Sequence, residues 1–293
     1  MNRPSFSVII PTLNAEAELS NLLSKLCRQE WIPNEILVVD SSSEDRTSEI
    51  ASSFPLVRFH RINRLDFNHG GTRDWAFRNT SGDFVLYLTQ DALPENDFYT
   101  RNILEPFDDP RVALVTGRQI PKRDARRYVQ LVQEYNYPET SNTRGLSDLT
   151  SMGIKALFCS DTCSAYRRSA LQEVGGIPNP CATNEDMLAA ARLIKKGWMI
   201  RYEARARVVH SHNLTPSEQY RRNRLIGRFL IQYREELSVA SEVGEGLSLV
   251  QRVASRLVAE GHPIELMSFG VDCLARFLGN LAGKKDQSFK HGE

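Results

Sequence analysis

Acidic residues and histidines recur in this chain at positions where an alternating strand and helix pattern would bring polar groups together. They are Asp40, Asp91, Asp186, His210 and His212. Asp40 and Asp91 each follow an apolar run that predicts a buried strand, and the two histidines end a third such run. Open α/β sheets bind ligands just outside the carboxyl ends of their strands. A carboxylate combined with a distant histidine suits a hard divalent cation whose open positions take phosphate oxygens.

The acidic residues also have plain structural interpretations when each is taken alone. Asp91 is followed by Pro94 and fits an ordinary turn aspartate that caps the next helix. Glu185 and Asp186 stand in the first turn of a predicted helix, where the helix dipole favours negative charge whatever the function. What favours a ligand site is that all these groups fall at strand or helix ends of one predicted sheet.

The segments that would position these residues alternate between strand and helix patterns. Strand patterns occur at residues 5–10, 35–39, 56–62, 84–88, 112–116 and 199–209, and residues 158–166 could return to the same sheet. Helical patterns lie between them, at residues 44–54, 72–79, 96–107, 168–174 and 185–196. The first helix is marked by Leu19, Leu22 and Leu26 on one face, with Asn14 as its expected N-cap. This order predicts an α/β fold with a Rossmann-like, mostly parallel central sheet flanked by helices.

Two loop segments have compositions that favour binding. Gly70 and Gly71 precede the predicted helix at 72–79, so free amide groups and the positive end of its dipole would face outward there. A glycine-assisted loop with a solvated Arg73 is the simpler alternative. Residues 121–155 show little periodicity and begin with a basic run, which suits either a binding loop or lid, or a solvated basic face.

The pattern becomes helical after Thr215, which predicts a catalytic domain at 1–214 and a helical region at 215–293. An apolar stripe in this region is spaced alternately four and three residues apart: Met267, Val271, Leu274, Leu278 and Leu281. Packing on the main domain, a seam between two subunits and contact with a membrane surface all fit such a stripe. The tail after Lys284 is expected to be disordered.

Composition limits the cellular setting and the class of protein. The 293 residues carry a formal net charge of +1, which gives no general attraction for nucleic acid. Five unevenly spaced cysteines argue against a disulfide framework and fit a reducing cytoplasm. We expect no signal peptide, and no uncharged apolar run approaches the roughly 20 residues that cross a bilayer. The chain has neither a P-loop nor a G-x-G-x-x-G motif, which argues against an ATPase or a dinucleotide dehydrogenase.

Four ordered segments resemble the family 2 glycosyltransferases, which are inverting enzymes with the A-type nucleotide-sugar fold. The segments are Ser-Val-Ile-Ile-Pro-Thr-Leu-Asn at 7–14, Val-Val-Asp-Ser-Ser-Ser at 38–43, Gly-Thr-Arg-Asp at 71–74 and Asn-Glu-Asp-Met at 184–187. Segments 67–73, 89–92 and 209–212 are similar to the bacterial rhamnosyltransferase branch. The match runs from about Ser5 to about His212, and the basic helix after Thr215 resembles that branch more loosely.

The resemblance implies a role for each matching residue. Those implied to bind the donor nucleotide are Pro11, Thr12, Asn14, Asp40, Ser42, His69, Gly70, Arg73 and Gln90. Asp40 would accept a hydrogen bond from the pyrimidine ring. Asp91 would be the remaining metal-binding aspartate of a D-x-D motif, with His212 as the distal contact and His210 less favoured. Asp186 would be the catalytic base.

The resemblance implies an inverting, Mg²⁺- or Mn²⁺-dependent glycosyltransferase in the cytoplasm or at the inner face of the plasma membrane. It would move L-rhamnose from dTDP-L-rhamnose to a hydroxyl of a growing, lipid-linked bacterial surface glycan. The alternatives are another donor such as a UDP-hexose, or a nucleotidyltransferase. A nucleotidyltransferase would normally carry a glycine-rich, basic N-terminal loop, which residues 11–14 lack. A non-catalytic sugar-binding module would not need Asp91, Asp186 and His212 together.

Overall fold

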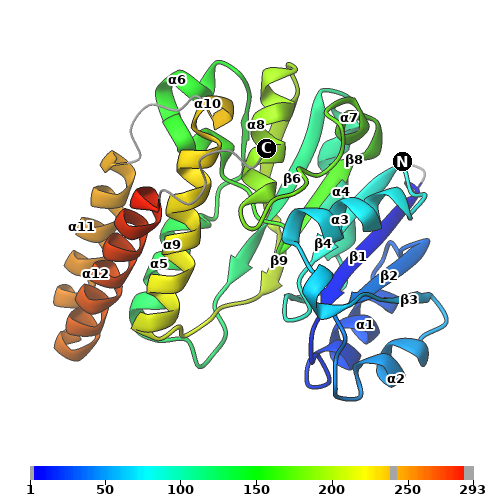
Figure 1. Ribbon diagram of the computed structural model, residues 1–293, viewed down its shortest axis with the longest axis horizontal. Coiled ribbons are helices and arrows are strands. Elements are labelled where there is room, and N and C mark those ends of the chain that lie inside the picture. Colours follow the sequence, from blue (N-terminus) through cyan, green and yellow to red (C-terminus); the bar gives the residue numbers. More distant parts are fainter. Residues whose placement is uncertain (1–2, 238–242, 287–293) are drawn as a thin grey trace.

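The computed structural model describes residues 3–237 and 243–286, which form a mixed sheet with helices on both faces (Figure 1). Within these residues the strands are β1 (Phe6–Thr12), β2 (Glu35–Asp40), β3 (Val57–Arg61), β4 (Phe84–Leu88), β5 (Leu93–Pro94), β6 (Val112–Ile120), β7 (Asn142–Arg144), β8 (Cys163–Arg167) and β9 (Met199–Val209). Their order is β3-β2-β1-β4-β8-β6-β9-β5, with β7 also paired to β9. Strands β1–β4, β6 and β9 run in one direction, and β5, β7 and β8 run against it. The prediction of a mostly parallel sheet is confirmed.

The sheet separates two hydrophobic clusters, as the side-chain alternation of a strand requires. On β1, Val8 and Ile10 pack on one face with the leucines of the first helix, whereas Ile9 packs on the other face. Both faces of the central strands are therefore buried, which explains their continuous apolar runs. The carboxyl ends of β1, β2 and β4 consequently meet at one edge of the sheet.

Twelve α-helices lie within the described residues. They are α1 (Leu19–Cys27), α2 (Thr47–Ser52), α3 (His69–Arg78), α4 (Tyr99–Leu104), α5 (Arg127–Asn136), α6 (Asp148–Met152), α7 (Arg168–Glu173), α8 (Glu185–Lys195), α9 (Pro216–Gln232), α10 (Arg234–Leu237), α11 (Val243–Ala259) and α12 (Pro263–Lys285). The expected N-cap at Asn14 is wrong, because α1 begins five residues later and the Asn14 side chain accepts a hydrogen bond from the Glu44 amide. Residues 121–155 are more regular than expected, since they contain α5, β7 and α6.

Helices α9, α11 and α12 form a layer with α5 beside the β6–β9 part of the sheet (Figure 1). Tyr128 and Leu131 of α5 share a hydrophobic cluster with Val253, Leu257 and Phe269 of α11 and α12. Helices α9 and α12 approach so closely that a side chain at any of three glycines would overlap the facing backbone; these are Gly227, Gly279 and Gly283. The predicted C-terminal helical region is present. The expected disorder after Lys284 is wrong for the next two residues, because α12 continues to Lys285 and the Asp286 carboxylate accepts from Arg224; residues 287–293 lie outside the described part.

None of the described helices combines the length and the apolar character that crossing a bilayer requires.

Candidate active site

Asp91, His210 and His212 come together although more than a hundred residues separate the aspartate from the histidines. Asp91 follows β4 and both histidines follow β9, and the Asp91 Oδ2 atom lies 3.4 Å from His210 Nε2 and 3.2 Å from His212 Nε2. One ligand atom from each residue lies within 4.8 Å of the others. Burial favours the neutral carboxyl, but the hydrogen bond from His210 and the charges of both histidines lower the pKa of Asp91 well below its usual range. We call these three residues the Asp-His-His cluster.

The cluster fits a divalent cation by the chemistry of its donor atoms. Gln119 Nε2 donates to Ser160, so the Gln119 Oε1 atom accepts from the Nδ1–H of His210 at 2.8 Å. In the neutral ring this hydrogen bond leaves a lone pair on His210 Nε2, so a cation between Nε2 and the Asp91 carboxylate would take the place of the proton that joins them in the charged ring. Lys122 Nζ lies 3.9 Å from Asp91 Oδ2 and adds positive charge at the same place. His210, which sequence analysis favoured less than His212, is an equal member of the cluster.

A cavity of about 340 Å³ opens at the carboxyl ends of β1 and β2, a size that suits a nucleoside. Its walls include five of the residues implied to bind the donor: Pro11, Thr12, His69, Arg73 and Gln90. Ser41, Arg64 and Phe67 also line it. Burial, followed by the charge of Arg73, lowers the pKa of His69 to about 4, so this ring is neutral at pH 7. We call this space the nucleoside cavity.

Three other residues implied to bind the donor nucleotide do not line the cavity but bond to the loops that form it. Asp40 is fully buried and accepts from Thr12 Oγ1 at 3.1 Å and from the Ser43 amide at 2.9 Å. The Ser42 hydroxyl donates to the Ile62 carbonyl, and it is the neighbouring Ser41 that faces the nucleoside cavity. Asn14 is bonded to the Glu44 amide. Direct contact between these residues and a pyrimidine stays a prediction, but their side chains shape the two turns that form the cavity.

The expectation of free amide groups at Gly70 and Gly71 is wrong. Helix α3 begins at His69, and its first amides are already bonded: Gly70 donates to the Cys181 carbonyl and Gly71 to the Asn68 side chain. A side chain at Gly70 would overlap the Pro178 carbonyl oxygen. These glycines therefore permit the close contact between α3 and residues 178–181, and the helix end is not an open anion site.

Gln90 connects the Asp-His-His cluster with the nucleoside cavity. Its side-chain amide forms two hydrogen bonds with the backbone of Leu13, accepting from the amide at 2.8 Å and donating to the carbonyl at 3.2 Å. The residue before Asp91 thus fixes the loop after β1. A shorter or acidic side chain at this position could not form both bonds.

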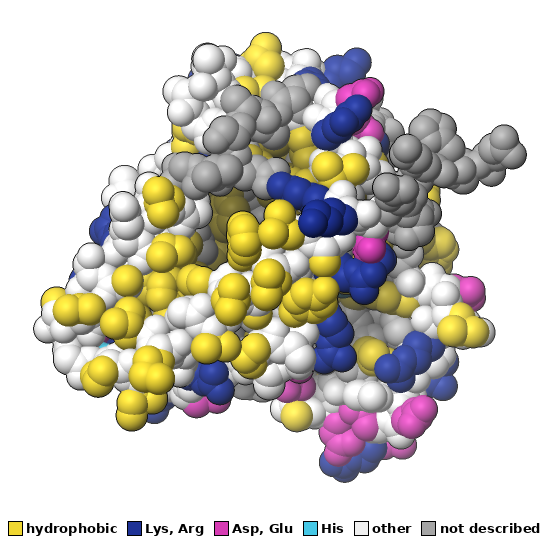
Figure 2. Space-filling model, turned by 60° about the vertical axis from the view of Figure 1, so that its left-hand side comes forward, with side chains coloured by type: hydrophobic (Ala, Val, Ile, Leu, Met, Phe, Trp, Pro, Cys, Tyr) yellow, Lys and Arg dark blue, Asp and Glu magenta, His cyan; other side chains and the backbone are white. Residues whose placement is uncertain are grey.

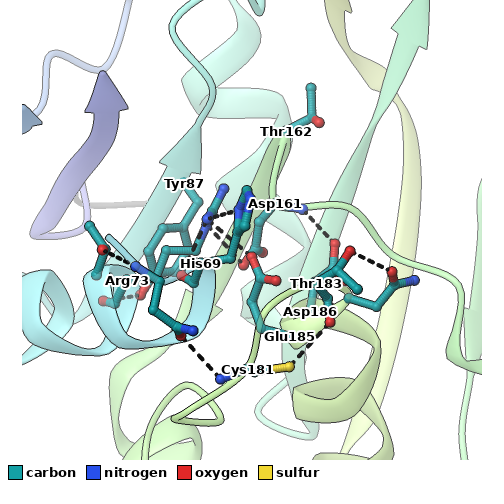
Figure 3. Close-up of polar contacts among 12 residues, drawn as sticks. His69, Arg73, Tyr87, Asp161, Thr162, Cys181, Thr183, Glu185 and Asp186 are labelled. Atoms are coloured by element: carbon teal, nitrogen blue, oxygen red, sulfur yellow. Dashed lines mark hydrogen bonds and ion pairs between the residues drawn. The ribbon is translucent and has the colours of Figure 1, made fainter. Parts of the chain in front are cut away.

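Arg73 lies in a buried group of charges beneath this edge of the sheet (Figure 3). Its Nη1 atom lies 3.0 Å from Glu185 Oε1, and its Nε atom lies 3.7 Å from Asp161 Oδ2. Asp161 also accepts from the Ser164 and Tyr166 hydroxyls at 2.6 and 2.8 Å. Sequence analysis gave Asp161 no role; the available signal was that an arginine on a buried helix requires an acidic partner.

Asp186 joins the same group from the start of α8. Its Oδ2 atom accepts from the Asp161 amide at 3.1 Å, and its Oδ1 atom accepts from the Met187 amide at 2.7 Å. Burial, followed by the charges of Glu185 and Asp161, raises the pKa of Asp186 to about 8. The side chain is half-buried, so it combines a raised proton affinity with access to solvent. Such a carboxylate can accept a proton from a sugar hydroxyl.

A second cavity, of about 230 Å³, borders the Asp-His-His cluster. Both histidines line it, as do Ser160 and Thr162, which flank the residue that bonds to Asp186. Its remaining wall comes from α5, α9 and Arg276 of α12. The cluster is therefore next to both spaces: Gln90, the residue before Asp91, lines the nucleoside cavity, and the two histidines line a second space that the C-terminal helices help to close. We call this second space the helical cavity.

Comparisons with known proteins identify relatives of this chain. The family model described as "Glycosyl transferase family 2" matches residues 7–175. The O-antigen chain rhamnosyltransferase RfbN of Salmonella typhimurium is 35% identical over 284 residues, covering 96% of this chain and 90% of its own. The O-antigen chain rhamnosyltransferase WbaN of Salmonella anatum is 36% identical and covers 97% of this chain and 91% of its own.

Solved structures show the same fold at low sequence identity. The mannosyltransferase PcManGT of Pyrobaculum calidifontis, in complex with GDP-Man and Mn²⁺, superimposes with a TM-score of 0.64 at 18% identity, covering 97% of this chain and 89% of its own. TarS of Staphylococcus aureus, in complex with UDP-GlcNAc, has a TM-score of 0.57 at 17% identity, covering 97% of this chain and 92% of its own. The extent of the family match, together with the identity to RfbN and WbaN along nearly the whole chain, is decisive: the protein belongs to glycosyl transferase family 2.

Proposed function

We propose that this glycosyltransferase moves L-rhamnose from dTDP-L-rhamnose to a hydroxyl group of a lipid-linked bacterial surface glycan, with inversion at the anomeric carbon. The observation that carries the proposal is the placement of the Asp-His-His cluster next to the nucleoside cavity and the helical cavity, with Asp186 nearby. The printed names of RfbN and WbaN support rhamnose as the sugar and O-antigen as the product.

In the proposed reaction the nucleoside cavity holds the thymidine, and a hydroxyl group of the acceptor attacks the anomeric carbon. A new bond forms between the acceptor oxygen and that carbon while the bond to the diphosphate breaks. Asp186 takes the hydroxyl proton, an effect typically worth about 10²–10⁴ in rate. A cation held by Asp91, His210 and His212 would neutralise the charge that develops on the leaving diphosphate.

The donor set favours Mn²⁺ over Mg²⁺ as this cation. Two imidazoles and one carboxylate form the cluster, and Mg²⁺ prefers sites made of oxygen ligands alone. The Mn²⁺ in the PcManGT complex supports the same choice. We therefore propose Mn²⁺ as the better activator, with Mg²⁺ supporting slower turnover.

The same site residues would also serve a different donor such as a UDP-hexose, because none of them is assigned to the sugar part of the donor. A screen of dTDP-rhamnose, UDP-hexoses and GDP-mannose, each with Mn²⁺, Mg²⁺ or chelator, tests the proposal by product release. We expect Mn²⁺-dependent release of dTDP that requires an acceptor. Turnover confined to a UDP-sugar would replace rhamnose with that sugar and leave the chemistry unchanged.

We propose that the helical region at 215–293 also brings the enzyme to the inner face of the plasma membrane. Apolar side chains gather over the face that α9, α11 and α12 form (Figure 2). On α12 they are Ile264, Met267, Val271, Leu274, Phe277, Leu278 and Leu281, all exposed. In the middle of this helix Arg276 donates a hydrogen bond to Asp272, and Asp272 is buried. A lipid-linked acceptor favours lipid over a second subunit as the partner of this face.

A further inference from the structure

The helical cavity carries a feature that the catalytic assignment leaves unused, namely the side chain of Arg222 on α9. Arg222 lines the cavity together with His210 and His212. Among the described residues, no hydrogen bond or ion pair holds its guanidinium group. The arginine is thus directed into a space that borders the Asp-His-His cluster, without an acidic partner.

Neighbouring arginines on the same helix are bonded differently. Arg224 and Arg228 both donate to the Asp286 carboxylate, at 2.9 Å and 2.5 Å from their Nε atoms. Arg221 and Arg222 are neighbours in the sequence and both reach solvent, but only Arg222 lines the helical cavity. Among these four arginines, Arg222 is therefore the only one that lines the cavity, and its charge has no bonded partner in the described part of the chain.

The surroundings of Arg222 make the helical cavity positive. Although part of the Arg222 side chain reaches solvent, desolvation of its charged group, followed by the charge of Arg276, lowers its pKa; the guanidinium group nevertheless stays protonated. Arg276 also lines the cavity and is bonded to Asp272 at 2.6 Å. The Asp186 carboxylate lies close enough to attract Arg222, which places the guanidinium near the proposed base.

A second group in the same wall also lacks a partner. The Gln133 Nε2 atom donates to the His210 carbonyl, whereas its Oε1 atom is buried and has no hydrogen-bond donor among the described residues. Buried polar atoms in native proteins are nearly always bonded, so an atom of this kind indicates a missing donor. A ligand that offers both anionic oxygens and hydroxyl groups would satisfy Arg222 and Gln133 together.

We propose that Arg222 binds phosphate oxygens of a substrate, so that helix α9 contributes a binding residue to the active site. A guanidinium group presents donors in a fork that matches two phosphate oxygens. Two phosphates are available if the proposed function is correct: the diphosphate of the donor and a phosphate of the lipid-linked acceptor. Arg222 would bind the phosphate oxygens of either source in the same way. The inference rests on the proposed function only for which molecule carries the phosphate.

The test compares the full-length wild-type protein with Arg222→Gln and Arg222→Lys, and with Arg221→Gln as the matched control. The first measurement is calorimetric titration with inorganic pyrophosphate in the presence of Mn²⁺, which requires no turnover. We expect Arg222→Gln to bind at least tenfold more weakly, Arg222→Lys to bind with intermediate affinity, and Arg221→Gln to bind as the wild type does. The melting temperature of Arg222→Gln should not fall, since the substitution removes no hydrogen bond or ion pair within the described part of the chain.

Two further measurements assign the source of the phosphate. If the donor supplies it, Arg222→Gln weakens dTDP binding but leaves thymidine binding unchanged. If the acceptor supplies it, KM rises for an alkyl phosphate-linked sugar but not for the uncharged alkyl glycoside. The inference is overturned if Arg222→Gln matches the wild type in pyrophosphate binding, in dTDP binding and in KM for the phosphate-linked acceptor. It is also overturned if Arg221→Gln weakens pyrophosphate binding as much as Arg222→Gln does and Arg222→Gln has a lowered melting temperature. Arg222-dependent pyrophosphate binding without any sugar transfer would reject the proposed function instead.

Discussion

The Nη1 atom of Arg73 lies 3.0 Å from the Oε1 atom of Glu185, and both side chains are buried. This contact joins α3, whose start lines the nucleoside cavity, to α8, whose first turn carries Asp186. One positive charge thus faces three carboxyl groups, those of Glu185, Asp161 and Asp186. Burial raises the pKa of Asp186, and the excess of negative charge from Glu185 and Asp161 raises it further.

Replacing Arg73 with leucine should destabilise the fold strongly. Removing one partner of a buried ion pair typically costs about 3–5 kcal/mol, because the other charge stays buried without compensation. Urea unfolding at pH 8 measures this loss. The control is Arg111→Leu, which removes an exposed arginine whose partner Asp109 is also accessible to solvent and should leave the unfolding midpoint nearly unchanged.

The pH dependence of Arg73→Leu follows from the carboxyl groups that it leaves unpaired. The pKa values of Asp161 and Asp186 are already raised in the wild type, and the loss of Arg73 would raise that of Asp161 further, so the folded state binds more protons than the unfolded chain. Its stability should therefore increase as the pH falls from 8 to 6. A stability that stays constant over this range would show that another cation replaces Arg73.

Asp186→Asn should abolish turnover and leave donor binding nearly intact. The amide keeps the shape of the side chain but cannot accept a proton, so kcat should fall by about 10²–10⁴. Steady-state kinetics and dTDP titration separate the two effects. Asp97→Asn makes the same charge change at an exposed position and should behave as the wild type. Normal turnover by Asp186→Asn would remove Asp186 from the role of base.

The pH–rate profile should show an acidic limb that belongs to Asp186. A base with a pKa of about 8 is mostly protonated at neutral pH, so kcat/KM should rise as the pH increases toward 8. Asp161→Asn removes one of the charges that raise this pKa and should move the limb to lower pH. An unshifted limb in Asp161→Asn would mean that another group controls the profile.

The fold was predictable because its signals are local in sequence. Continuous apolar runs indicated the parallel strands, and leucines at helical spacing indicated α1. The four leucines of this helix are all buried: Leu19, Leu22, Leu23 and Leu26. The start of α1 was misplaced because Asn14 has the side chain of an N-cap but accepts instead from the Glu44 amide, 30 residues away. Helix α5 was missed because its buried face depends on α11 and α12, which follow more than a hundred residues later.

The candidate site was predictable only in part, for a related reason. Asp91, Asp186 and His212 stand at element ends, where sequence alone locates them. The orientation of a side chain depends on distant partners, so Gly70 and Asp161 could not be assigned: the Gly70 amide bonds to Cys181, and Asp161 faces Arg73 across the fold. Arg222 was visible as one of several arginines; what distinguishes it is its place in the wall of the helical cavity, where it has no bonded partner among the described residues.

The two histidines of the cluster should contribute similarly to metal binding. His210→Ala and His212→Ala each remove one Nε2 atom that lies within 3.4 Å of Asp91, and Asp91→Ala removes the carboxylate. We expect each variant to lose Mn²⁺-dependent dTDP binding in calorimetry. Gln119→Ala frees the His210 ring and should weaken Mn²⁺ binding by about 10–100-fold. Normal Mn²⁺ dependence in His210→Ala would restrict the cluster to Asp91 and His212.

Charge placed on the apolar face of α12 should release the enzyme from lipid without changing its chemistry. Leu274 is 56% exposed in the middle of this face, so Leu274→Glu should fold normally and lose flotation with anionic vesicles. Its activity on a water-soluble acceptor should equal that of the wild type, whereas activity on a vesicle-bound acceptor should fall. Glu260→Gln changes charge away from this face, at a side chain bonded to Arg127, and serves as the control. If the wild-type protein does not bind vesicles but forms a dimer that Leu274→Glu disrupts, the face belongs to a contact with a second subunit.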